Sequence, residues 1–197
     1  FMTQPALSER IKKLEKELKN CDEFFISSAF ITLGGLTPLL QDFLELEQRG
    51  IKGKILTTDY LNFTDPKALK KLQSLDNIEV KLYAQEKNGF HTKGYVFRKN
   101  NIYKGIVGSS NLTLNALTVN KEWNVEFTSL HDGEVLNNLL DEFNSLWQEA
   151  SNLEDVLPAY EKLYDSQKNF TKLKENYKKL SSEDLVPNSM QIGFMES

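Results

Sequence analysis

Apolar residues in the first half of the chain alternate between two spacings. Helical spacing predicts three helices, over residues 6–20, 36–48 and 65–75. Short apolar or alternating runs predict three strands, over residues 22–29, 52–58 and 78–83. An order of helix, strand, helix, strand, helix, strand predicts an α/β domain with a mainly parallel sheet.

The second half of the chain has a different pattern. Three β-rich runs lie over residues 92–98, 102–107 and 122–129. Asn100 and Asn101 form a plausible tight turn between the first two runs. A helix with one apolar face is predicted over residues 132–150. We expect the compact domain to span residues 1–157. Residues 158–197, whose first part is rich in Lys and Tyr, are expected to form a helical linker.

Composition excludes several classes of protein. Hydrophobic residues make up 40% and charged residues 26%, as in a folded globular protein rather than a disordered or fibrous one. The net charge is −4, so a nucleic-acid site must be local. Cys21 is the single cysteine, which excludes an intramolecular disulfide and suggests the cytoplasm. The chain has no apolar run of membrane-spanning length, and we expect no membrane partner.

The chain has two histidines, and one stands near a lysine. His91 and Lys93 are two residues apart at the start of a predicted strand, so their side chains should project from the same face. An imidazole beside an ammonium suits phosphoryl oxygens, and the lysine charge keeps the imidazole neutral and nucleophilic. A chance pair on an exposed strand is the alternative. His131 precedes a predicted helix, and we expect it at the surface.

A run of small and polar residues follows the hairpin. Gly108 lets the backbone approach an anion closely, and Ser109, Ser110 and Asn111 offer hydroxyl and amide groups to a phosphate. A plain turn with a helix cap is the alternative, because Ser and Asn serve both purposes.

A carboxylate on the next strand is a candidate to hold the histidine. Glu122 and Glu126 alternate onto one face, and either could fix the imidazole tautomer by a hydrogen bond. A solvated strand edge is the alternative. Residues 84–105 also hold five basic residues and one acidic residue, a local excess that suits a polyanion.

Taken in order, these elements resemble the phospholipase D superfamily. The signature of that superfamily is His-x-Lys followed by Gly-Ser-x-Asn, matched here by His91, Lys93, Gly108, Ser109 and Asn111. The resemblance covers roughly residues 22–150. It implies a phospholipase D-like sandwich, with a mixed, largely parallel sheet flanked by helices and a C-terminal helical linker.

The chain departs from the superfamily pattern at one position. Arg98 stands where an Asp usually follows the lysine by five residues. Metal-independent restriction-type nucleases and nuclease-like domains attached to helicases also lack that Asp. They use a glutamate after Gly-Ser-x-Asn, which matches Glu122. Arg98 therefore argues against a lipase-type member more than against activity.

The tail carries a second resemblance. Residues 187–191, including Met190 and Gln191, resemble the segment before the ATP-binding loop of superfamily 2 helicases. The Gly-Lys-Thr loop does not follow, so ATP and magnesium are expected only for a helicase motor outside this sequence. We expect the chain to be the N-terminal part of a longer DNA helicase acting in restriction or repair.

The family resemblance implies a mechanism. His91 attacks phosphorus and forms a phosphohistidine, while Lys93, Asn111 and Ser109 hold the phosphate oxygens and Glu122 orients His91. The domain needs no metal or other cofactor. Because this chain has one His-x-Lys motif, the resemblance implies a homodimer with a shared active site.

The leading interpretation is a metal-independent phosphodiesterase that cleaves DNA. One alternative is a non-catalytic module that binds DNA or mediates dimerisation and retains the phosphate pocket. A phospholipase or lipid-headgroup transferase is the third interpretation.

Overall fold

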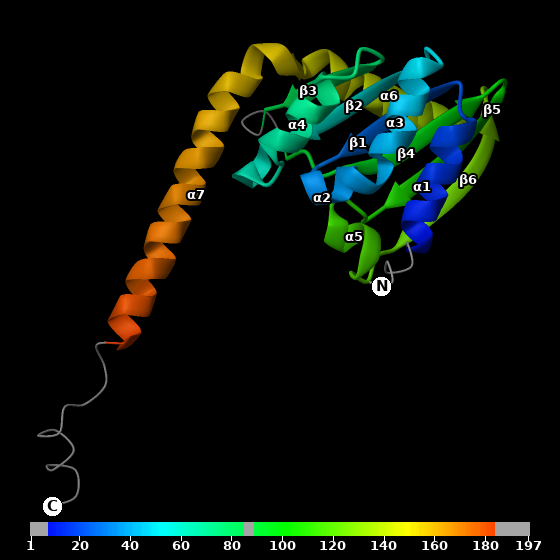
Figure 1. Ribbon diagram of the computed structural model, residues 1–197. Helices are drawn as coiled ribbons and strands as arrows, with labels where there is room; N and C mark the ends of the chain where they lie inside the picture. Colours follow the sequence, from blue (N-terminus) through cyan, green and yellow to red (C-terminus); the bar gives the residue numbers. More distant parts are fainter. Residues whose placement is uncertain (1–7, 85–88, 184–197) are drawn as a thin grey trace, which may run out of the picture. The chain divides into compact units, whose positions relative to one another are not determined.

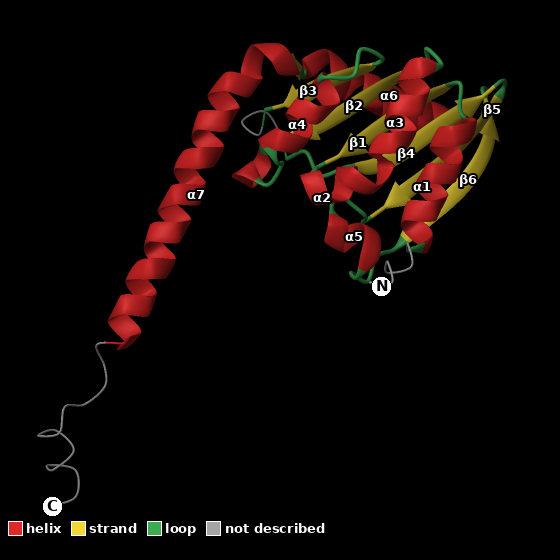
Figure 2. Cartoon of the chain, viewed as in Figure 1, coloured by secondary structure: helices red, strands yellow, loops and turns green. Residues whose placement is uncertain are grey.

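A seven-stranded mixed sheet forms the centre of the fold (Figures 1 and 2). The computed structural model describes residues 8–84 and 89–183. The strands, in chain order, are β1 (Glu23–Ser28), β2 (Lys52–Thr58), β3 (Ile78–Tyr83), β4 (Lys93–Lys99), β5 (Ile102–Gly108), β6 (Asn124–Leu130) and β7 (Ser151–Asn152). They lie side by side in the order β6-β5-β4-β1-β2-β3-β7.

The two halves of the sheet differ in strand direction. β1, β2 and β3 run parallel, whereas β1–β4, β4–β5, β5–β6 and β3–β7 are antiparallel. The predicted α/β fold with a mixed sheet flanked by helices is confirmed. The expectation that the sheet is largely parallel is wrong, because parallel pairing is confined to the strands joined by helical crossovers. β5 follows β4 through the tight turn at Asn100, with φ 53°, and so short a turn permits only antiparallel pairing.

Helices cover both faces of the sheet. They are α1 (Glu9–Asn20), α2 (Leu33–Leu36), α3 (Leu40–Gln48), α4 (Pro66–Gln73), α5 (Leu114–Thr118), α6 (Glu134–Glu149) and α7 (Leu153–Glu183), with short 3-10 turns η1 (Thr37–Leu39) and η2 (Tyr60–Asn62). Successive residues of β1 show the two layers. Phe24 packs on Phe43 of α3, and Phe25 packs on Phe143 of α6, with ring centroids 5.6 Å apart in each pair.

A close approach joins α2 to the loop after β5. A Cβ added at Gly35 would lie 2.3 Å from the carbonyl oxygen of Leu112, so no larger residue fits there without a shift. The sequence pattern does not predict α2, which contains Gly34 and Gly35, because paired glycines normally interrupt a helix. Neither α5 nor β7 is predicted, since both are too short to show a period.

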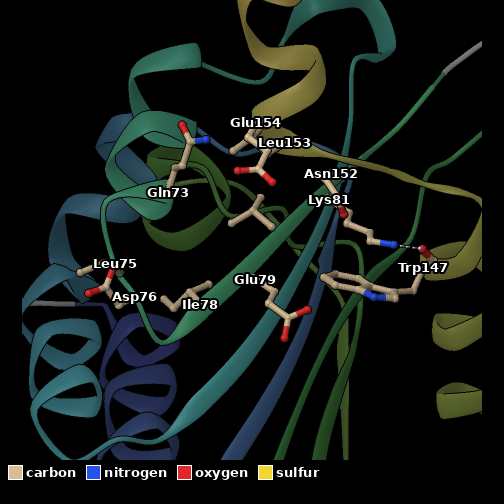
Figure 3. Close-up of a pocket in the computed structure, with 11 residues that line it drawn as sticks. Gln73, Leu75, Asp76, Ile78, Glu79, Lys81, Trp147, Asn152, Leu153 and Glu154 are labelled. Atoms are coloured by element: carbon tan, nitrogen blue, oxygen red, sulfur yellow. Dashed lines mark hydrogen bonds between the residues drawn. The ribbon is translucent and has the colours of Figure 1, made fainter.

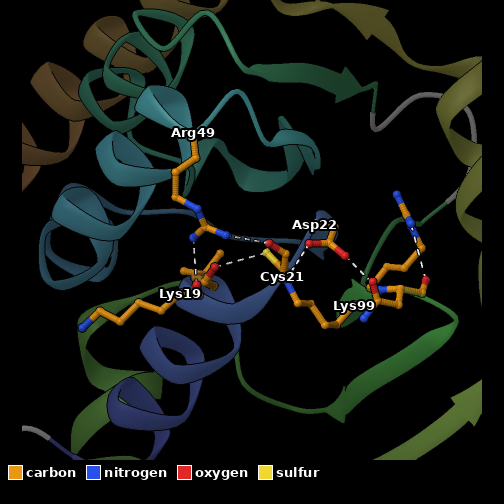
Figure 4. Close-up of polar contacts among 8 residues, drawn as sticks. Lys19, Cys21, Asp22, Arg49 and Lys99 are labelled. Carbon is orange, nitrogen blue, oxygen red and sulfur yellow. Dashed lines mark hydrogen bonds and ion pairs between the residues drawn. The ribbon is translucent and has the colours of Figure 1, made fainter.

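One end of the sheet is closed by polar contacts on β1 and its neighbours (Figure 4). The Asp22 carboxylate accepts hydrogen bonds from Lys99 Nζ at 2.7 Å and from the Asn100 backbone at 2.8 Å. Arg49 donates to the Cys21 carbonyl oxygen at 3.3 Å. Burial raises the pKa of the Cys21 thiol to about 11, so this cysteine is unreactive.

The chain divides into two units after Tyr160. Leu157 and Tyr160 are buried in the first unit, where the Tyr160 hydroxyl donates to the Thr64 carbonyl oxygen at 2.7 Å. The helix in the predicted linker, residues 158–197, begins earlier, at Leu153, and runs through Pro158. None of the described helices combines the length and apolarity needed to span a bilayer.

Candidate functional site

The carboxyl end of β1 brings together the two candidate motifs. Ser28 is fully buried and pairs in register with Lys93, the first residue of β4. The Ser28 hydroxyl accepts a hydrogen bond from the Leu112 backbone at 2.9 Å, and Ile31 forms an isolated parallel bridge with Leu112. The loop after β5 therefore lies beside the start of β4. Neither Ser28 nor Ile31 shows this role in the sequence, because it depends on strands far apart in the chain.

His91 and Lys93 lie in direct contact. Lys93 Nζ donates hydrogen bonds to His91 Nδ1 and to the His91 carbonyl oxygen, each at 2.7 Å. His91 itself is exposed at the mouth of the site, whereas Lys93 is buried. Desolvation, and then the charge of Lys93, hold the pKa of the His91 imidazole below its ordinary value of 6.5. The imidazole is therefore neutral at pH 7, as a nucleophile must be.

Glu122 supplies negative charge close to the buried lysine. Desolvation lowers the pKa of the Lys93 ammonium, and the charge of Glu122 opposes that shift. The carboxylate accepts hydrogen bonds from the Ser109 hydroxyl and, at 3.1 Å, from Asn120 Nδ2. These contacts differ from the expected hydrogen bond to His91. Glu126, the alternative carboxylate, forms an ion pair with Lys13 of α1 instead.

Asn111 is oriented by a backbone contact. Its Oδ1 atom accepts a hydrogen bond from the Phe30 backbone at 3.1 Å, which leaves the amide N–H groups to face outward. The Ser109 hydroxyl accepts from the Trp123 backbone at 3.0 Å and donates to Glu122. The Asn111 amide thus keeps its N–H groups as donors, whereas the Ser109 hydroxyl gives its single proton to Glu122.

Gly108 and Ser110 have structural neighbours. A Cβ at Gly108 would lie 2.0 Å from the Trp123 carbonyl oxygen, so glycine is required where β5 meets β6. Ser110 is buried, and its hydroxyl accepts from Asn124 Nδ2 at 2.8 Å. The hydroxyl of Tyr95 donates to the Ser110 carbonyl oxygen at 2.9 Å. Ser110 therefore anchors the loop and does not present its hydroxyl to the His91–Lys93 pair.

The position where the superfamily usually has Asp lies away from this site. Arg98 stands near the opposite end of β4 and forms an ion pair with Glu23 of β1 at 2.9 Å. Lys104 likewise pairs with Glu17 at 3.0 Å. The basic excess predicted from residues 84–105 is thus partly neutralised by acids of the first half of the chain. Lys87, another member of that group, lies outside the described residues.

An aromatic cluster, which the sequence pattern does not predict, lies beside His91. The Phe30 ring lies edge-on to the His91 ring, with centroids 6.1 Å apart. Phe30 also stacks on Tyr60, at 6.3 Å, and meets Phe63 at 5.2 Å. The Phe63 side chain is 57% exposed. One feature of the sequence could have indicated this cluster: aromatic residues follow β1 and β2 within two positions. The carboxyl ends of parallel strands meet at one edge of a sheet, where ligands commonly bind.

A cavity of about 380 Å³ lies at another part of the sheet, along β3 and β7 (Figure 3). Its lining includes Glu79, Lys81 and Trp147, and the Lys81 ammonium donates to the Trp147 carbonyl oxygen at 3.0 Å. None of the predicted site residues lines this cavity. Within residues 8–84 and 89–183, no group of three or more His, Cys, Asp or Glu side chains is placed to hold a metal ion. His131 is exposed in the turn before α6.

The site thus combines a neutral imidazole with groups that can neutralise an anion. The Lys93 ammonium contacts His91, and the Asn111 side chain is held at the backbone of Phe30, whose ring lies beside His91. The ammonium and the amide are hydrogen-bond donors suited to phosphate oxygens, whereas the Ser109 hydroxyl donates to Glu122. A carboxylate balances the buried ammonium. This set of groups fits attack by His91 on a phosphorus atom.

The chain is similar to known proteins in sequence and in fold. Residues 10–147 match the family model described as cardiolipin synthase, PLD-like domain. Comparison with curated protein sequences gives no match.

Among solved structures, NucT from Helicobacter pylori aligns with a TM-score of 0.56 and 18% identity, covering 73% of this chain and 91% of NucT. Nuc from Salmonella typhimurium, described as a phospholipase D family member, aligns with a TM-score of 0.55 and 16% identity, covering 72% of this chain and 88% of Nuc. Phosphatidylserine synthase from Haemophilus influenzae aligns with a TM-score of 0.55 and 15% identity, covering 83% of this chain and 42% of the synthase.

Proposed function

The chain belongs to the PLD-like domain family, and we propose that it is a metal-independent phosphodiesterase that cleaves DNA through a phosphohistidine. The observation that carries the proposal is the contact of the buried Lys93 ammonium with His91 Nδ1 at 2.7 Å. In this contact the proposed nucleophile lies directly against the cation that we propose to bind the phosphate. The likeness of the fold to NucT and Nuc supports a nuclease within the family.

The proposed reaction follows from the same contacts. An incoming phosphate competes for the Lys93 ammonium, which frees the imidazole lone pair to attack phosphorus. Lys93 and the amide of Asn111 then stabilise the charge that develops on the phosphate oxygens. The P–O bond to the leaving strand breaks, and an acid protonates that oxygen. Water next attacks the phosphohistidine, which releases the second strand end and restores His91.

The acid is proposed to come from a second copy of the chain. The described site contains one histidine, so a homodimer with one His91 from each subunit would supply both nucleophile and acid. Exposed apolar side chains beside Glu122 support this arrangement. Trp123 is 87% exposed and Val125 is 70% exposed, and both lie at the edge of the sheet next to the site.

The proposal that the substrate is DNA rests on the aromatic cluster as well. Phe63 and Phe30 present rings beside His91, and bases stack on such rings with little dependence on sequence. We also propose that the domain acts with a helicase motor in the cytoplasm. The support for the helicase is the resemblance of residues 187–191, which lie outside the described residues.

A nuclease assay in EDTA tests the proposed activity. We expect the wild-type chain to cleave plasmid or single-stranded DNA in EDTA, His91→Ala to be inactive, and His131→Ala to match the wild type. A strand end attached to the protein through an acid-labile bond should accumulate in rapid-quench samples. DNA binding without cleavage would favour the non-catalytic module. Cleavage that survives His91→Ala and stops in EDTA would contradict the proposal.

A further inference from the structure

A second cavity, of about 260 Å³, opens directly beside the His91–Lys93 pair. Both of these residues contribute to its lining, and the rest of the lining is mostly apolar. Val107 of β5 forms one wall, and Leu140 and Phe143 of α6 form the opposite wall. A group bound in this cavity would therefore be linked to a phosphate at His91 by only a few bonds.

Gly94 is part of the lining, and nothing in the described chain explains a glycine there. Its φ is ordinary, and a Cβ added to it would meet no atom within 4 Å. Two other glycines inside strands, Gly53 of β2 and Gly105 of β5, differ from Gly94 in this respect. The Phe24 ring covers Gly53, and the Phe127 ring covers Gly105, each at about 2 Å from the added Cβ. Gly53 and Gly105 each make room for an aromatic ring, whereas no described side chain of this chain covers Gly94.

We propose that this cavity binds one unstacked nucleobase, with its ring over Gly94, from the strand whose phosphate lies at His91. The inference rests on the proposed function and adds a base-binding site to it. Glycine inside a strand often marks the close approach of a ligand. The size agrees, because an apolar cavity of about 150 Å³ is known to hold one benzene ring.

The polar groups of the cavity favour a base over an alkyl chain. The hydroxyls of Ser27 and Thr92 share one hydrogen bond, so the pair has a second O–H to donate. Glu142 lines the cavity and offers a carboxylate to an exocyclic amino group of a base. An acyl chain would desolvate these groups and give them no partner.

Ligand binding by calorimetry tests the inference with matched variants. Gly94→Leu fills the cavity, and Gly94→Ala places one methyl group where the base ring would lie. Thr128→Leu, at an exposed position of β6 that does not line the cavity, is the control. The ligands are inorganic phosphate, deoxyribose 5-phosphate and the four deoxynucleoside 5′-monophosphates. We expect at least one nucleotide to bind the wild type and the Thr128→Leu control roughly tenfold more tightly than deoxyribose 5-phosphate does. Gly94→Ala should show a smaller difference, because its methyl group meets the base ring. Gly94→Leu should lose this advantage and bind phosphate like the wild type.

Several results would overturn the inference. Equal binding of all nucleotides and deoxyribose 5-phosphate to the wild type, with phosphate binding intact, would exclude the base site and leave the phosphodiesterase proposal standing. If the wild type binds no phosphate, both proposals fail. Dihexanoyl phosphatidic acid binding more tightly than glycerol 3-phosphate, with the difference lost in Gly94→Leu, would assign the cavity to an acyl chain.

A substrate-side experiment covers the case in which Gly94→Leu does not fold, as judged by circular dichroism. Single-stranded DNA with one abasic position on either side of the scissile bond is offered to the wild type. We expect one of the two positions to lower kcat/KM roughly tenfold, by loss of one bound base. Unchanged kcat/KM for both substrates would overturn the inference.

Discussion

The contact of His91 with Lys93 affects the protonation of His91, the proposed nucleophile. Desolvation is the larger cause of the lowered pKa of His91, and the Lys93 charge is the smaller one. Lys93→Met removes the charge and keeps the bulk. We therefore expect the pKa of His91 to rise part of the way towards 6.5, measured by NMR titration of the imidazole. The same variant should lose about 10²–10³ in kcat/KM, as when a charge-stabilising donor is removed.

The sign of the pH effect on stability follows from the same shift. The folded protein has the lower pKa for His91, so the unfolded chain binds the proton first as pH falls through 6.5. The contribution of His91 to stability is present above that pH and is lost below it. The change of the free energy of unfolding with pH should be smaller in Lys93→Met than in the wild type. Urea titrations between pH 5 and 7 measure it. A pKa of His91 above 6.5 in the wild type would contradict the structure.

Two glutamates offer a matched pair of variants. Glu122→Gln removes the charge that opposes the lowering of the Lys93 pKa, so Lys93 loses its proton more readily. We expect a kcat/KM decrease of about 10-fold or more that grows as pH rises. Glu126→Gln breaks an exposed ion pair with Lys13 and should keep full activity. Equal losses for the two variants, measured across pH 6–9, would count against the role of Glu122.

At the scale of elements, α2 and the loop after β5 depend on a glycine contact. Gly35→Ala would place its Cβ 2.3 Å from the Leu112 carbonyl oxygen and should destabilise the fold by about 1–3 kcal/mol. Gly34→Ala, next to it in the same helix, meets Leu114 at an ordinary 3.4 Å and should be neutral or slightly stabilising. Urea unfolding of both variants measures the difference. Similar midpoints would show that the loop moves aside at little cost.

Sequence periodicity predicts the elements better than it predicts their assembly. The strands over 52–58 and 78–83 are found at those bounds, because alternation and apolar runs are local signals. The direction of β4 relative to β1 is not determined by a local signal, and the prediction of a largely parallel sheet is therefore wrong. For the same reason, the sequence does not predict the hydrogen-bond and ion-pair partners of Glu122 and Arg98. Each depends on which strand end lies next to it in the folded chain.

At the scale of the whole molecule, the proposed dimer makes a quantitative prediction. Wild-type chain and His91→Ala are refolded together in equal amounts. If each site needs His91 from both subunits, only the wild-type dimers are active and activity falls to about one quarter of an all-wild-type sample. Independent sites would give about one half.

The exposed apolar residues at the sheet edge give a second test of the dimer. Trp123→Asp introduces a charge into the surface that we propose to be buried between subunits. We expect a monomer by analytical ultracentrifugation, with at least a tenfold loss of DNA cleavage. Thr128→Asp, at an exposed position of β6, the strand that begins directly after Trp123, is the control that should keep the oligomeric state.

The position of β1 at the junction of the two sheet halves has a consequence for folding kinetics. β1, β2 and β3 pair along a contiguous stretch of chain, and β4, β5 and β6 pair along another. The halves join when β1 meets β4, a contact between residues such as Ser27 and Thr92 that are 65 positions apart. Closing so long a loop is entropically costly and slow, so this pairing is expected late. Ser28 and Lys93 pair at that junction, and Ser28 also holds Leu112. The loop after β5 is therefore expected to take its place beside Lys93 only after the two halves have joined.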